Sequence, residues 1–129
     1  YEQQEMMALA ETCYRTVVQA NPHDVEALNN LGNTLLAQGQ RTAAMGFYKE
    51  ALRLQPGFAP PHKVLGNLLQ ESGSFVEAES VWRSLLKIEP DNNKAAIQLG
   101  RNLQQQGRKA EAEKLAARAA AIHRGAPTK

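Results

Sequence analysis

Three histidines and one cysteine are the side chains of this chain best suited to binding a metal or acting as a nucleophile. No two of His23, His62 and His123 have the spacing of metal ligands such as H-x-x-x-H, and Cys13 has no second cysteine to join it. Cys13 also lacks the neighbouring histidine or cationic cluster that would activate its thiol, so we expect a small buried apolar side chain. The sequence therefore predicts no metal, no cofactor and no enzymatic activity.

Basic residues gather near the end of the chain, where phosphate binding has to be considered. Gly100 and Gly107 precede Arg108 and Lys109, but the spacing differs from G-x-x-x-x-G-K-[ST] and no strand precedes it. We interpret Gly107 as a helix terminus. Aromatic residues that would stack on bases are absent from this stretch. Because the net charge is only +2, we expect a solvated basic face and no nucleic-acid partner.

Composition points to a single globular domain. The chain has 129 residues, of which 43% are hydrophobic and 22% charged, which is enough to bury a core. No apolar run approaches the roughly 20 residues that span a bilayer, so we expect no membrane insertion. A lone cysteine permits a reducing compartment, and we expect a cytoplasmic location. The chain does not begin with Met, which suggests a processed form or part of a longer protein.

A period of 34 residues organises the whole sequence and decides the fold. Six columns of identical residues keep this interval across three copies. They are Pro22, Pro56 and Pro90; Gly32, Gly66 and Gly100; Gly39, Gly73 and Gly107; Leu31, Leu65 and Leu99; Leu35, Leu69 and Leu103; and Ala44, Ala78 and Ala112. A recurrence of this kind indicates stacked structural repeats.

Each period contains two segments with apolar residues at helical spacing. A glycine ends the first segment and a proline ends the second, as expected of a helix C-terminus and of a residue that cannot continue a helix. The predicted helices are 2–20, 25–38, 42–54, 59–71, 75–88, 93–105 and 109–123. No segment alternates polar and apolar residues for long enough to predict a strand.

The pattern of residues within each period resembles the tetratricopeptide repeat family. The first copy carries the preferred residues at all eight conserved slots of that family, with leucine accepted for two aromatics. These residues are Leu28, Leu31, Gly32, Leu35, Ala44, Tyr48, Ala51 and Pro56. The later copies depart at several slots, including His62, Leu85, Ala96, Ala116 and Arg124. The resemblance implies an all-α, right-handed superhelical α-solenoid of stacked antiparallel helix pairs, with about seven helices.

The resemblance also divides the chain and suggests its packing. We expect an N-terminal helix or half-repeat at 1–22, three repeats within 23–124 (25–58, 59–92 and 93–124), and a tail at 125–129, forming together one domain. The alanines at Ala44, Ala78 and Ala112 are expected to face the glycines at Gly32, Gly66 and Gly100. Tyr48 and Trp82 are expected to reach into the next repeat. The final helix lacks such a bulky residue, so it either closes the stack or awaits a partner.

In this family the first helix of each hairpin lines a concave groove, and the same slots are carried over here. The resulting groove residues are Asn29, Asn33, Lys63, Asn67, Lys94, Ile97 and Arg101. Amide side chains both donate and accept hydrogen bonds, so they can hold the backbone of a peptide. The cations favour an acidic group. We therefore predict a protein-interaction module or scaffold that binds an extended or helical, acidic peptide segment.

Three alternatives remain open from the sequence. The repeats could be the arm of a larger enzyme such as a protein glycosyltransferase, or a secretion-type chaperone that holds an export substrate. The chain could also self-associate through the ends of the stack, where Met6 and Met7 and the alanine-rich last helix offer apolar surface.

Overall fold

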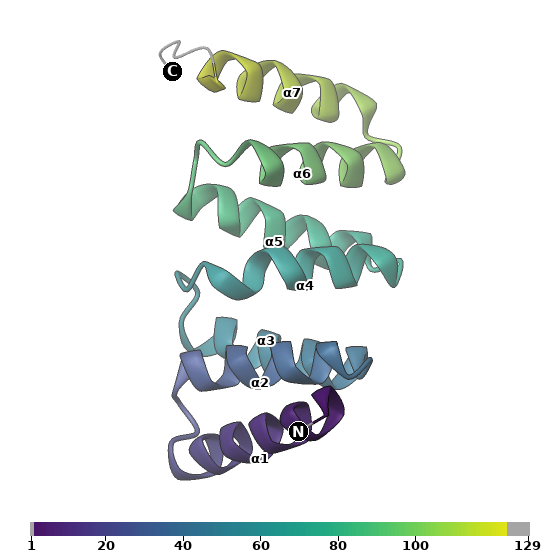
Figure 1. Cartoon of the computed structure of the whole chain (residues 1–129). Coiled ribbons are helices and arrows are strands. Elements are labelled where there is room, and N and C mark those ends of the chain that lie inside the picture. The colour runs from purple at the N-terminus through teal and green to yellow at the C-terminus, as the bar shows by residue number, and fades with distance from the viewer. Residues whose placement is uncertain (1, 124–129) are drawn as a thin grey trace. The chain divides into compact units, whose positions relative to one another are not determined.

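The computed structural model describes residues 2–123, which form seven α-helices and no strand (Figure 1). The helices are α1 (Gln3–Ala20), α2 (Val25–Ala37), α3 (Arg41–Leu54), α4 (Pro60–Glu71), α5 (Phe75–Ile88), α6 (Asn93–Gln105) and α7 (Lys109–His123). Their bounds agree with the predicted ranges to within one residue, and the all-α class is confirmed. The expected tail at 125–129 lies outside the described residues.

The repeated glycines end the first helix of each hairpin. Gly39, Gly73 and Gly107 have φ values of 79°, 81° and 78°, a conformation that glycine adopts without strain. After Gly39, the N–H of Gln40 donates to the carbonyl of Leu35 at 2.9 Å, the bond that defines a Schellman motif. The equivalent bonds follow the other two glycines. The glycines recur in the sequence because each of these helix ends needs a residue with positive φ.

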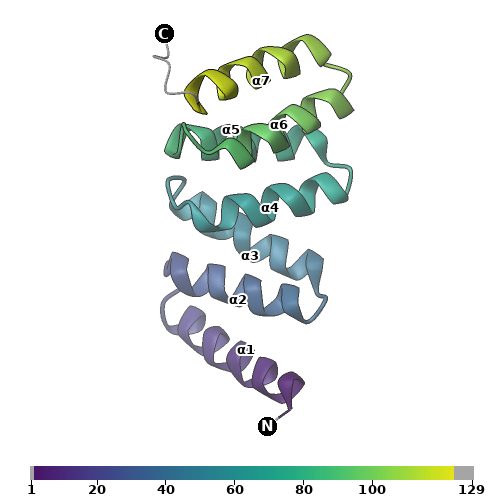
Figure 2. The same ribbon diagram turned by 45° about the horizontal axis from the view of Figure 1, so that its top comes forward.

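The chain forms two compact units, of which the first ends at Pro61 and the second begins at His62. In the first unit α2 packs against both α1 and α3. In the second unit α6 packs against both α5 and α7, and the three helices follow one another as successive layers in Figures 1 and 2. Short turns make neighbouring helices antiparallel. Each hairpin thus buries its apolar stripe against a neighbour, as expected of repeats that have no independent core.

The buried residues are mainly the leucines, alanines and aromatics of the repeat columns, whereas α1 contributes none. Val17, for example, keeps 38% of its surface exposed. Cys13 is also exposed, so the prediction that its side chain is buried is wrong. Cys13 lies on a side of α1 that stays exposed.

Aromatic rings lie directly above two of the repeated glycines. A Cβ atom on Gly32 would lie 2.8 Å from the ring of Tyr48, and one on Gly66 would lie 2.6 Å from the ring of Trp82. The atoms nearest to Gly32 and Gly66 therefore belong to the rings of Tyr48 and Trp82. Each ring lies against the first helix of its own hairpin. Glycine is required there because any side chain would occupy the place of the ring.

Polar atoms on the two rings fix them in this position. Tyr48 Oη donates to Asn33 Oδ1 at 2.5 Å, and Trp82 Nε1 donates to Gln70 Oε1 at 3.0 Å. Buried Tyr and Trp side chains need such partners because an unpaired N–H or O–H away from water costs about 1–3 kcal/mol. Both rings are almost completely buried.

The third hairpin breaks this arrangement. Ala116 stands where Tyr48 and Trp82 stand in the earlier hairpins, so no ring is available to cover Gly100. A Cβ atom on Gly100 would meet nothing within 4 Å. Gly100 therefore differs from Gly32 and Gly66, because the ring that lies above the glycine in the earlier hairpins is missing.

A carboxylate on α5 holds the turn between α6 and α7. Glu79 accepts hydrogen bonds from Arg83 (2.8 Å), Gln106 (3.1 Å) and Arg108 (2.6 Å). Arg108 also pairs with Glu111 in the first turn of α7. Arg108, one of the basic residues near the end of the chain, therefore has a structural role.

We expect the Glu79 network to make stability depend on pH. Burial raises the pKa of Glu79, but the hydrogen bonds from Arg83, Gln106 and Arg108 outweigh it and lower the pKa from 4.5 to about 2. A depressed pKa in the folded state stabilises the fold above the unfolded pKa, and that stability is lost as the pH falls from 4.5 to about 2. Because Arg83 and Arg108 are partly exposed, the expected cost of Glu79→Gln at neutral pH is about 1 kcal/mol.

Urea unfolding of Glu79→Gln across this pH range, beside the exposed control Glu113→Gln, measures the effect. The difference between wild type and Glu79→Gln should shrink as the pH falls below 4.5. A difference that stays constant down to pH 2 would contradict the assignment.

Candidate functional site

Five of the seven predicted groove residues line one cavity in the second unit. Lys63 and Asn67 come from α4, and Lys94, Ile97 and Arg101 come from α6. The cavity has a volume of about 320 Å³. Its other lining residues are Trp82, Leu85, Asn92, Ala95 and Gln98. We call this space the α4–α6 cavity.

Local structure explains why these side chains converge. Ile97 and Arg101 are separated by four residues, as are Lys63 and Asn67, so each pair lies on one helix face. The start of α6 is fixed by Asn92, whose Oδ1 accepts from the N–H of Ala95 at 3.0 Å. An N-cap of this kind sets the rotation of the helix and hence the direction of the side chains that follow.

The other two predicted residues, Asn29 and Asn33, lie on α2 in the first unit. The side chain of Asn33 is exposed, but its Oδ1 already accepts the hydroxyl of Tyr48. Its N–H groups and one remaining lone pair of Oδ1 are left for a ligand. The sequence could not reveal this because the bond depends on the ring of Tyr48 folding back onto α2.

The charged side chains that line the α4–α6 cavity are all positive. Lys63, Lys94 and Arg101 are exposed cations, and none forms an ion pair with a carboxylate among residues 2–123. No Asp or Glu lines the cavity. Ile97 adds an apolar surface that is 54% exposed. Within the described part of the chain, the side chain of Asn67 makes no hydrogen bond, so its amide is available to a ligand.

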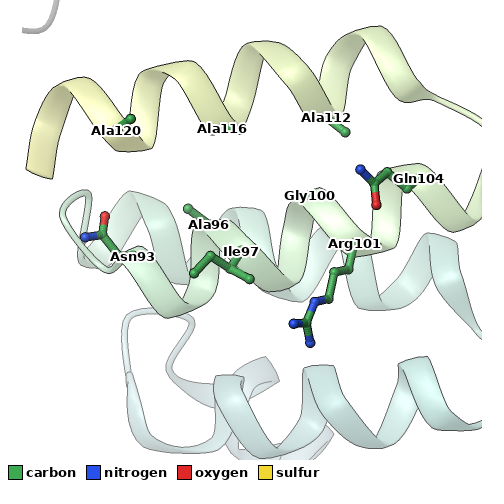
Figure 3. Close-up of a pocket in the computed structure, with 9 residues that line it drawn as sticks. All are labelled: Asn93, Ala96, Ile97, Gly100, Arg101, Gln104, Ala112, Ala116 and Ala120. Atoms are coloured by element: carbon green, nitrogen blue, oxygen red, sulfur yellow. The ribbon is translucent and has the colours of Figure 1, made fainter.

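A second cavity, which the sequence did not predict, lies between α6 and α7 and has a volume of about 430 Å³ (Figure 3). Its lining residues are Asn93, Ala96, Ile97, Gly100, Arg101, Gln104, Ala112, Ala116 and Ala120. We call it the α6–α7 cavity. Ile97 and Arg101 line both cavities, so the two adjoin along α6. The one signal in the sequence was the replacement of an aromatic residue by Ala116.

Within residues 2–123, no cluster of three or more His, Cys, Asp or Glu side chains could hold a metal ion. No helix in the same range combines the length and apolar character needed to cross a membrane. His62, at the start of α4, is buried, whereas His23 is exposed.

Comparison with solved structures finds helical-repeat proteins of the same fold. A crystal structure of MamA matches with a TM-score of 0.78 and 21% identity over 88% of this chain and 62% of its own. A second MamA structure, AMB-1, gives 0.78 and 21% over 92% and 64%. YrrB, described as a TPR protein with an unusual peptide-binding site, gives 0.73 and 19% over 90% and 60%. The chain thus spans less than two thirds of the length of these proteins.

Sequence comparison identifies the family. No curated protein matches the chain. Two family models, each described as tetratricopeptide repeat, match residues 2–57 and 69–127. Together they cover most of the sequence, and the three repeated prolines Pro22, Pro56 and Pro90 lie within the matched ranges. The chain belongs to the tetratricopeptide repeat family of helical protein-interaction scaffolds.

Proposed function

We propose that the chain binds an extended or helical peptide segment with an acidic group, in a groove lined by the first helices of its hairpins. The observation that carries this proposal is the α4–α6 cavity, where three unpaired cations, a free amide and an exposed isoleucine converge. Asn29 and Asn33 on α2, in the first unit, are proposed as further peptide-binding residues. The description of YrrB as a protein with a peptide-binding site supports a ligand of this class.

The chemistry of the cavity favours an acidic peptide over a neutral one. A carboxylate near Lys63, Lys94 or Arg101 would form charge-assisted hydrogen bonds with side chains that lack a carboxylate partner. Asn67 can both donate to and accept from a peptide backbone, which fixes the ligand with little regard to its sequence. Because the cations are exposed, the affinity should fall as the salt concentration rises.

Peptides selected from a random displayed library against the full chain would test the proposal. We expect acidic peptides to be enriched, and Lys63→Ala/Lys94→Ala to weaken their binding about tenfold, a loss of about 1.4 kcal/mol. Lys109→Ala/Lys114→Ala is the matched control because it removes the same charge from exposed positions of α7.

Calorimetric titration measures both variants, and circular dichroism checks that they fold. Equal affinity of the selected peptides for wild type and folded Lys63→Ala/Lys94→Ala, with no effect of Asn67→Ala, would rule out the groove.

A further inference from the structure

The α6–α7 cavity occupies the place that an aromatic ring fills in the two earlier hairpins. In those hairpins Tyr48 covers Gly32 and Trp82 covers Gly66. The third hairpin keeps the glycine, Gly100, but has Ala116 at the position of the ring. The result is open space above Gly100 and a cavity of about 430 Å³, within the size range of sites that bind small groups.

The polar partner of the missing ring is also present. Gln70, which accepts the indole N–H of Trp82, recurs one period later as Gln104. Gln104 lines the α6–α7 cavity, and Figure 3 shows its side chain between α6 and α7. The remaining walls near Gly100 are the methyl groups of Ala112, Ala116 and Ala120. An apolar cavity with the amide of Gln104 beside Gly100 suits an indole or phenol ring.

We infer that the α6–α7 cavity receives a tryptophan or tyrosine side chain of the bound peptide, with an acidic residue of the same peptide beside it in the α4–α6 cavity. This inference rests on the proposed function, because it places the aromatic residue on the peptide that the groove binds.

The charge of Arg101 and the contact between the two cavities favour a peptide with an aromatic residue next to an acidic one. Arg101 lines both cavities and pairs with no carboxylate in the described part of the chain, so a carboxylate next to the ring would meet a cation. Ile97, also shared by the two cavities, provides an apolar contact between the two peptide side chains. A partner that offers an aromatic residue flanked by Asp or Glu matches both cavities at once.

Three blocked tripeptides provide the probes: Ac-Glu-Trp-Glu-NH2, Ac-Glu-Ala-Glu-NH2 and Ac-Gln-Trp-Gln-NH2. Each is titrated into the isotope-labelled full chain, and the backbone amide shifts are followed by NMR. We expect the Glu-Trp-Glu peptide to bind at least about tenfold more tightly than the Glu-Ala-Glu peptide and to shift the amides of Gly100, Gln104 and Ala116. The Gln-Trp-Gln peptide should bind less tightly than the Glu-Trp-Glu peptide because it lacks the carboxylates.

Ala116→Trp should supply the missing ring within the chain. We expect it to raise the urea midpoint of unfolding and to reduce binding of the Glu-Trp-Glu peptide to the level of the Glu-Ala-Glu peptide. Ala117→Trp, at a position of the same helix that does not line the cavity, should do neither. If Ala116→Trp lowers the midpoint, or if it leaves Glu-Trp-Glu binding unchanged, the cavity does not take a ring and the inference is overturned.

The outcomes separate this inference from the proposed function. Equal affinity for the Trp and Ala peptides, or no binding by either, overturns the aromatic site. The proposed function stands in that case if library-selected peptides still depend on Lys63 and Lys94. A second copy of the chain is the other possible occupant of the cavity, and sedimentation at several protein concentrations tests for it. Self-association that Ala116→Trp abolishes would assign the cavity to a second copy of the chain and overturn the inference.

Discussion

Replacement of Trp82 by alanine is expected to lower the free energy of unfolding by about 3–5 kcal/mol, the usual cost of removing a large buried aromatic side chain. Only 1% of its surface is exposed, and its ring contacts Gly66. The variant would also leave Gln70 Oε1 without the indole donor that it has in the wild type. The loss therefore combines a cavity with an unpaired polar group.

Urea unfolding measures this loss. Far-ultraviolet circular dichroism is the signal to follow, because the variant lacks the only tryptophan of the chain and therefore has no tryptophan fluorescence. Val76→Ala on the same helix is the matched control, because Val76 is 73% exposed and its truncation should change stability by less than about 0.5 kcal/mol. A loss below about 1 kcal/mol for Trp82→Ala would show that the ring does not join α4 to α5 as described.

Alanine at Gly100 is expected to stabilise the fold and alanine at Gly66 is not, although the two glycines are equivalent in the repeat. Replacing a glycine inside a helix by alanine gains about 1 kcal/mol of helix propensity. At Gly100 nothing lies within 4 Å of the new methyl group, so the gain should be realised in full. At Gly66 the methyl group would lie 2.6 Å from the buried ring of Trp82.

Overpacking of this kind costs about 1–3 kcal/mol, which offsets or exceeds the gain in propensity. The two variants should therefore differ by about 2 kcal/mol in urea unfolding. Gly32→Ala, which would place its methyl group 2.8 Å from Tyr48, should behave like Gly66→Ala. Stabilisation by both Gly66→Ala and Gly100→Ala, to the same extent, would contradict the difference between the second and third hairpins.

The helices could be predicted from the sequence because their ends depend on local chemistry. Glycine at the left-handed position after α2, α4 and α6, and proline shortly after α1, α3 and α5, act through the backbone within a few residues. A 34-residue period then repeats these signals three times, which removes the ambiguity of a single occurrence. The agreement of helix bounds with the prediction follows from this redundancy.

The directions of the large side chains could not be predicted in the same way. Periodicity gives the face of a helix, but it does not say whether the ring of Tyr48 or the methyl group of Ala44 lies nearest to Gly32. That choice depends on the packing between helices. The same limit explains why Cys13 was predicted to be buried and is exposed. It also explains why the hydrogen bond that occupies Asn33 Oδ1 could not be foreseen.

The residues of the candidate site could be predicted only from the resemblance to the family. They were carried over from the family pattern, and five of them line a single cavity. Whether that cavity binds a peptide stays a prediction. The α6–α7 cavity was missed because the absence of a ring at Ala116 had been interpreted as a property of the end of the stack, whereas its consequence is the open space above Gly100.

Backbone amide shifts on binding of a library-selected peptide test the central claim most directly, because they locate the ligand on the chain. The account predicts that the shifts concentrate on α4 and α6, at Lys63, Asn67, Lys94, Ile97 and Arg101. Shifts confined to the exposed side of α5, around Val76 and Arg83, with α4 and α6 unchanged, would contradict it.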